Sequence, residues 1–151
     1  MLNNMSQIKF KIVTPERVVF EDTIDAVSIP TMDGEITVLP HHIPLIGLLK
    51  AGVLRIKKGN EEVPLAVSSG VIEVDATRVV ILADTAERAD ELEEEKIERA
   101  REEAKKLMES KRGDAAGFAE ASALLERELA RLKVARRRHA PRSGPRPISE
   151  Q

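Results

Sequence analysis

Three histidines and many surface carboxylates are the side chains of this chain that could support acid–base or metal chemistry. His41 and His42 are adjacent in a segment bracketed by Pro40 and Pro44, and His139 stands alone near the C-terminus. Neighbouring side chains on an extended segment point to opposite faces, so His41 and His42 are poorly arranged to bind one metal ion. We therefore expect no metal site and assign this histidine pair a structural or contact role.

Other signatures of catalysis are missing from the sequence. The chain has no cysteine, which excludes thiolate metal sites and cysteine nucleophiles. No serine lies in the glycine pattern of a nucleophile elbow, and neither common phosphate-binding loop, G-x-x-x-x-G-K or G-x-G-x-x-G, occurs. Aromatic residues make up 2% of the chain, which disfavours surfaces that stack on sugars or single-stranded nucleic acids. We expect a protein that is not an enzyme and holds no cofactor.

The segment from Asp33 to Pro44 has the composition of a contact loop. It opens with a turn signal, Asp33-Gly34, and ends in the proline-framed histidine pair. Asp-Gly favours a positive φ at the glycine, and each proline fixes φ and removes an amide donor. The segment predicts a rigid, exposed loop at the end of a sheet, where partner contacts are common.

The elements that must position this loop are short strands. Between residues 8 and 83 apolar residues alternate with polar ones in short runs separated by turn residues, which favours an antiparallel β-sandwich or barrel. The predicted strands are 8–12, 18–20, 24–29, 36–39, 53–57, 63–67, 71–74 and 79–82. The apolar run 43–49 fits either a strand or a helical turn.

The composition changes to strong helix formers after Asp84. Residues 85–111 predict a first helix, with Asp90 and Glu93 as a capping pair, and residues 116–138 predict a second helix. Both have narrow apolar stripes, which indicates an antiparallel hairpin. The expected α+β organisation is a sandwich domain over 1–85, a helical hairpin over 86–139 and a disordered, proline-rich tail over 140–151.

Positive charge is concentrated at the C-terminal end. Residues 111–151 contain ten Lys and Arg against five Asp and Glu. The cations on or beside the second helix are Arg127, Arg131, Lys133 and Arg136 to Arg138. Three interpretations remain open: ordinary solvation of a helix C-terminus, binding to nucleic-acid phosphates, or docking to an acidic protein surface.

The order and spacing of several motifs resemble one family. They are F-K-I-V-T-P-E near the start, D-G-E-I-T-V-L-P-H-H-I-P-L-I, S-G-V-I-E-V and V-V-I-L-A-D-T-A-E-R-A. Together they make the chain similar to the epsilon subunit of the F-type ATP synthase of bacteria, whose mitochondrial equivalent is called delta. The resemblance extends from about Ile8 to Val134.

This resemblance implies a rotor protein on the cytoplasmic face of the bacterial cell membrane, held there only as a peripheral part of the synthase. Its sandwich would bind the gamma subunit and the c-ring, and its helices would inhibit ATP hydrolysis by extending into the alpha/beta catalytic head. The implied c-ring contacts are Asp33, Glu35, His41 and His42. The implied inhibitory contacts with the catalytic subunits are Arg127, Arg131, Lys133 and Arg136.

Some members of this family bind ATP through I/L-D-x-x-R-A at the start of the first helix. The matching stretch here is Leu92 to Ile97, in which Glu93 replaces the Asp, Lys96 the Arg and Ile97 the Ala. Losing the planar guanidinium and adding bulk both oppose nucleotide binding, so we expect no ATP site at Glu93 and Lys96. The alternative to a rotor subunit is a free-standing sandwich adaptor whose basic helix binds nucleic acid or an acidic protein.

Overall fold

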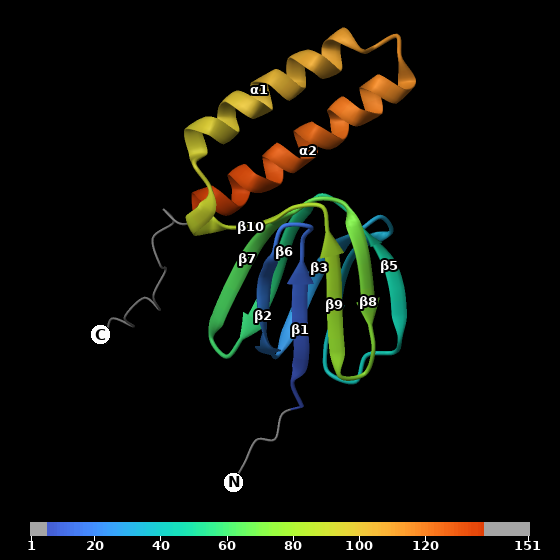
Figure 1. The fold of residues 1–151 in the computed structure, drawn as a ribbon, viewed down its shortest axis with the longest axis vertical. Coiled ribbons are helices and arrows are strands. Elements are labelled where there is room, and N and C mark those ends of the chain that lie inside the picture. Colours follow the sequence, from blue (N-terminus) through green and yellow to red (C-terminus); the bar gives the residue numbers. More distant parts are fainter. Residues whose placement is uncertain (1–5, 138–151) are drawn as a thin grey trace, which may run out of the picture.

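The structure, a computed structural model, describes residues 6–137. This part of the chain contains ten strands and a helical hairpin, arranged as Figure 1 shows. The strands are β1 Ile8–Val13, β2 Val18–Ile24, β3 Ala26–Thr31, β4 Gly34–Val38, β5 Leu45–Leu49, β6 Gly52–Lys58, β7 Glu61–Val67, β8 Gly70–Val74, β9 Arg78–Ala83 and β10 Ala86–Arg88. A short 3₁₀ turn, Ala89–Glu91, leads to helices α1, Glu94–Ser110, and α2, Ala115–Arg137.

The sheet follows the order β10-β7-β6-β3-β5-β8-β9-β1-β2, with β4 paired to β3. A single residue pair, Thr31 with Leu49, joins β3 to β5, and the sheet bends there into two layers. The predicted sandwich or barrel is therefore confirmed as a nearly closed sandwich. Among the described strand pairs only β1 and β9 are parallel; the others are antiparallel as expected.

Along most strands every second side chain points into the core of the sandwich. On β1, Ile8, Phe10 and Ile12 are almost fully buried, whereas Lys9 and Lys11 point outward. The core cluster contains sandwich residues alone, from Ile8 to Ala86. The core of the sandwich is thus complete without the helices.

Two elements differ from the sequence-based expectation. The ambiguous run 43–49 contains strand β5, which pairs with β8 along its whole length. Strand β10 was not predicted; it pairs with β7 and lies after residue 85, where we expected the sandwich to end. Three residues are too few to produce a recognisable alternation, so this strand depends on its tertiary partner.

The expected helical hairpin is present, and α2 matches the predicted second helix closely. Figure 1 shows the hairpin over one end of the sandwich, with α2 nearer to the strands. The capping prediction was wrong, because α1 begins at Glu94 and Glu93 makes no side-chain capping hydrogen bond. Because β10 pairs with β7, the chain stays extended as far as Arg88, and α1 begins later than expected. The Arg88 N–H instead donates to Glu91 Oε2 at 2.9 Å.

A second, smaller apolar cluster joins the hairpin to the sandwich. It consists of Ala66 on β7, Leu92 between the 3₁₀ turn and α1, Ile97 in the first turn of α1, and Leu132, Val134 and Ala135 on α2. The predicted stripe of α2 is only partly buried: Ala121 and Leu132 are buried, whereas Phe118 and Leu129 are 39% and 46% exposed.

The predicted disordered tail, 140–151, and the end of the predicted hairpin, with His139, lie outside the described residues. Within residues 6–137, neither helix is both long enough and apolar enough to cross a lipid bilayer.

Candidate functional site

The segment predicted to form one contact loop is divided by a strand. Gly34–Val38 forms β4, and its register places Gly34 opposite Thr31 and Val38 opposite Val27. Asp33 therefore lies in the turn before β4, and Met32 of the same turn lines a pocket together with Phe118 of α2, so this turn is at the end of the sandwich that faces the helices. His41 lies beyond the other end of β4, where its N–H donates to the carbonyl of Ala76 in the β8–β9 turn at 2.9 Å.

At about 3.3 Å per residue, β4 separates these two groups by roughly 15 Å. The structure thus brings Asp33 near Glu35, and His41 near His42, but it does not bring the four predicted contact residues together.

The turn at Asp33 is held by its neighbours. The Asp33 N–H donates to Thr31 Oγ1 at 3.2 Å, and Gly34 adopts φ 114°, a conformation that favours glycine. Glu35 forms an ion pair with Arg55 of β6. Asp33 therefore has a fixed backbone and an exposed side chain, while the charge of Glu35 is already partly neutralised.

The histidine pair forms a separate tip. His41 adopts φ 64°, which is uncommon for a residue other than glycine, and its Nε2 lies 2.9 Å from Ser6 Oγ. His42 is half-buried, and its Nδ1 donates to the Ile43 carbonyl at 2.7 Å. Residues 6–137 contain no group of three His, Cys, Asp or Glu side chains arranged for a metal. Leu39 and Ile43 beside them are 56% and 75% exposed, which makes this tip apolar.

A larger apolar surface covers the outer face of β5, β8, β9 and β1, and sequence reasoning missed it. Leu48, Val71 and Leu82 are 60%, 43% and 56% exposed, and the register places them side by side on β5, β8 and β9. Val13 on β1 continues this row next to Leu82. Ile46, two residues before Leu48, is 77% exposed on the same side of β5. We call these five residues the apolar face.

A signal for the apolar face was present in the sequence. Strands β5, β8 and β9 carry apolar residues on both of their faces, as in L-I-G-L-L and V-V-I-L-A. Such runs are typical of strands that are covered on both sides, whereas a solvated antiparallel sheet shows apolar–polar alternation. The outer layer that would cover these strands is missing from residues 6–137.

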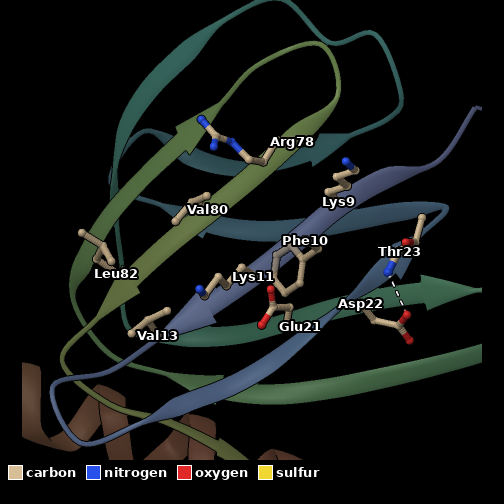
Figure 2. Close-up of a pocket in the computed structure, with 10 residues that line it drawn as sticks. All are labelled: Lys9, Phe10, Lys11, Val13, Glu21, Asp22, Thr23, Arg78, Val80 and Leu82. Atoms are coloured by element: carbon tan, nitrogen blue, oxygen red, sulfur yellow. Dashed lines mark hydrogen bonds between the residues drawn. The ribbon is translucent and has the colours of Figure 1, made fainter.

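Cations border the apolar face. Figure 2 shows Lys9 and Lys11 of β1 and Val80 and Leu82 of β9 among the residues that line a pocket on this face. This shallow cavity has a volume of about 650 Å³. Arg78, the first residue of β9, lies opposite Lys9 in the register. Acidic side chains of β2 line the other side of the cavity (Glu21 and Asp22). The surface combines an apolar row with a charged margin.

The basic residues of α2 contact carboxylates of the same chain. Arg131 Nη1 donates to Glu128 Oε2 at 2.8 Å, and its Nη2 donates to Glu87 Oε2 of β10 at 3.0 Å. Burial opposes the charged form, but the hydrogen bonds to Glu87 and Glu128 outweigh it and raise the pKa of Arg131 above its ordinary value. This arginine is therefore bound between two elements and is not free for a partner.

Arg136 is bound in a similar way on the surface. Its Nε and Nη2 donate to Glu94 and Glu98 of α1 at 3.0 and 2.8 Å. These hydrogen bonds, chiefly the one to Glu94, raise the pKa of Arg136. Arg127 Nε lies 3.8 Å from Glu128 Oε1, and Lys133 is exposed beside the groove between α2 and β6. Such pairing leaves little unneutralised charge on α2, which weakens the interpretation as a nucleic-acid surface.

The stretch that corresponds to the nucleotide motif is occupied by protein contacts. Glu93 and Lys96 are largely exposed and pair with each other at 2.9 Å. Ile97 is 1% exposed and packs in the cluster between the hairpin and the sandwich. An isoleucine therefore fills the position at which the nucleotide-binding motif has alanine.

Comparisons with known proteins agree with this architecture. The family model described as the beta-sandwich domain of the ATP synthase delta/epsilon chain matches residues 7–89. An ATP synthase epsilon chain of Dehalococcoides mccartyi strain CBDB1 is 45% identical over 134 residues, which cover 89% of this chain and 96% of that protein. An ATP synthase epsilon chain of Chloroflexus aggregans is 47% identical over 128 residues, or 85% of this chain and 91% of that protein.

Solved structures give the same result. A chain in the Euglena gracilis mitochondrial ATP synthase structure of OSCP, F1 and c-ring superposes with a TM-score of 0.69 and 25% identity, covering 80% of this chain and 76% of that chain. A chain in the Tetrahymena thermophila mitochondrial ATP synthase structure of central stalk and c-ring has a TM-score of 0.55 at 14% identity, covering 85% and 96%, and is similar in fold.

Proposed function

Because this chain belongs to the family of ATP synthase delta/epsilon chains, we propose that it is a non-catalytic subunit of the central stalk of the F-type ATP synthase. It turns with the rotor and helps to couple ion translocation through the c-ring to ATP synthesis. Relatives of nearly full length that carry the epsilon-chain name support this assignment. It acts at the cytoplasmic face of the bacterial membrane, which it reaches only through the complex.

The apolar face is the observation that carries the proposal, and the gamma subunit is the partner we assign to it. A solvated sheet face normally exposes less apolar surface than the row formed by Leu48, Val71 and Leu82 together with Ile46. Burial under a partner would remove this surface from water, and the cations Lys9 and Lys11 at its margin would favour a partner with acidic groups nearby.

The contact with the c-ring is proposed at one end of the sandwich. Asp33 and His41 lie at opposite ends of β4, so a ring that meets the sandwich end-on touches only one of them. The chain contains no cysteine, so a single cysteine placed at residue 33 or at residue 41 can be cross-linked without background. The residue that cross-links to the c subunit identifies the end; cross-linking from neither residue would contradict the contact.

The regulatory part of the proposal concerns the hairpin. Arg127, Arg131, Lys133 and Arg136 would face acidic residues of the alpha/beta head when the hairpin leaves the sandwich and extends. The present hydrogen bonds of Arg131 to Glu87 on β10 and of Arg136 to Glu94 on α1 support this, since both guanidinium groups are already placed to bind carboxylates. Extension would block rotation and thereby inhibit ATP hydrolysis.

Cross-linking in the assembled complex tests the proposal. A cysteine at Val71, in the middle of the apolar face, should cross-link to gamma through a short bifunctional reagent. A matched cysteine at Glu103, on the exposed side of α1, serves as the control and should give little gamma product. Cross-linking of gamma from Glu103 but not from Val71 would contradict the assigned docking face.

A further inference from the structure

Glu128 is the one charged residue that is buried among residues 6–137, with 6% of its surface exposed. A buried carboxylate is costly unless it is paired, so its partners indicate why it is kept. It accepts a hydrogen bond from Arg131 Nη1 at 2.8 Å, one helical turn further along α2. The Arg127 guanidinium approaches its other oxygen, at 3.8 Å.

Arg131 extends this cluster from the helix to the sandwich. Its Nε lies 2.9 Å from Glu87 Oε1, and its Nη2 donates to Glu87 Oε2 at 3.0 Å, so both oxygens of Glu87 face the guanidinium. The side chains of Arg131 and Glu87 are only 22% and 21% exposed. The charges of Glu87, Arg131 and Glu128 are therefore screened less by solvent than those of a surface pair.

The other contacts between α2 and the sandwich are weaker. Arg137 pairs with Glu62 at 2.8 Å, but these side chains are 40% and 51% exposed. Lys50 and Glu126 are 4.0 Å apart and about half exposed. Exposed pairs of this kind contribute little to stability. The apolar cluster at the same junction contains small side chains, Ala66 and Ala135, beside Leu132 and Val134.

We propose that Glu87 and Glu128 form a latch around Arg131 that controls whether the hairpin stays on the sandwich. This inference rests on the proposed inhibitory function, because Arg131 is one of the residues assigned to the catalytic head. Arg131 cannot contact Glu87 on the sandwich and reach the catalytic head at the same time, because the second position requires α2 to leave the sandwich. Docking of α2 on the sandwich and binding of Arg131 to the head are thus mutually exclusive.

The two carboxylates have different tasks in this latch. Glu128 is on the same helix as Arg131 and moves with it, so it partly neutralises the arginine in either position. Glu87 stays on the sandwich and is the group that a carboxylate of the partner must replace. Such an exchange keeps Arg131 paired with a carboxylate in either position of the hairpin.

The test measures hairpin position in the full chain. Spin labels on cysteines at Glu61 and Glu120, both exposed, report the distance between the sandwich and α2. Glu87→Gln should raise the population of long distances about tenfold, because it removes the charge from a largely buried pair. The matched control Glu62→Gln removes an exposed glutamate that also pairs with α2 and should change this population about twofold or less.

Circular dichroism shows whether Glu87→Gln disturbs folding. Two further variants keep the result interpretable if it does. Glu87→Asp keeps the charge and should give a smaller shift than Glu87→Gln. In a chain that already carries Arg131→Gln, Glu87→Gln should open the hairpin little further, since the contact that it removes is already gone. Equal distance distributions for Glu87→Gln and Glu62→Gln would overturn the latch.

Hydrolysis by the assembled complex separates the latch from the function on which it rests. Glu87→Gln should deepen inhibition of ATP hydrolysis severalfold, because Arg131 is released toward the catalytic head. If the hairpin opens in the isolated chain and hydrolysis does not change, the latch stands and the proposed inhibitory function fails.

Discussion

Replacing two leucines of the apolar face should weaken binding to the gamma subunit without unfolding the sandwich. Leu48 and Leu82 are 60% and 56% exposed and lie on either side of Val71 in the cross-strand register. The double variant Leu48→Thr with Leu82→Thr removes most of their apolar surface. Threonine is β-branched and suits strands, and both positions point away from the core, so folding should be preserved.

The magnitude follows from the exposed fraction. Complete burial of a leucine side chain contributes about 1.5–3 kcal/mol, and somewhat more than half of each side chain remains to be buried here. Threonine keeps one methyl group, so the two changes together should cost about 1–2 kcal/mol of binding free energy. This corresponds to a dissociation constant roughly five- to thirtyfold higher.

Isothermal titration of the full chain with isolated gamma measures the effect. The matched control replaces two exposed leucines of the hairpin, Leu107→Gln with Leu124→Gln, which are 42% and 41% exposed and lie outside the apolar face. The control should change the dissociation constant by about twofold or less. Unchanged affinity in the face variant, together with a loss in the control, would refute the assignment of the docking surface.

Three further predictions concern the hairpin, the nucleotide and the pH. Ending the chain after Ala89 should raise ATP hydrolysis by the assembled complex while its ion pumping is kept, because the sandwich core contains no hairpin residue. Unchanged hydrolysis would contradict the inhibitory role. Calorimetric titration with ATP should give no saturable binding, since Ile97 is buried at the motif position, and a saturable isotherm would contradict this. The backbone N–H of Thr77 donates to Asp75 and lowers its pKa, so Asp75 stabilises the fold above its unfolded-state pKa, and this contribution is lost as pH falls through the folded-state value. Acid unfolding curves check this: Asp75→Asn should lower stability at neutral pH and narrow its gap to the parent chain in acid, and a constant gap would disprove it.

The sequence predicted most strands because their alternation is strong. Ile8, Phe10 and Ile12 illustrate this, since each lies in the core while the intervening lysines face outward. Strand β10 could not be found in this way, because its three residues become a strand only through pairing with β7. The same pairing moved the start of α1 past the capping pair expected at Asp90 and Glu93.

The candidate site was predicted less well, for a geometric reason. Asp33 and His41 are eight positions apart in the sequence, and a segment framed by turn residues at both ends resembles one loop. The intervening residues pair with β3, and this pairing sends the two ends in opposite directions. The partners of Arg131 were equally hidden, since Glu87 is 44 residues away in the chain.

Recovery of gamma with this chain tests the central claim most directly. The tagged chain, purified from cells that produce the whole synthase, should retain one gamma subunit per chain, and the Leu48→Thr, Leu82→Thr variant should retain less. The contrary result is a chain that is recovered without gamma and that carries DNA or RNA removable by salt, as the free-standing adaptor would.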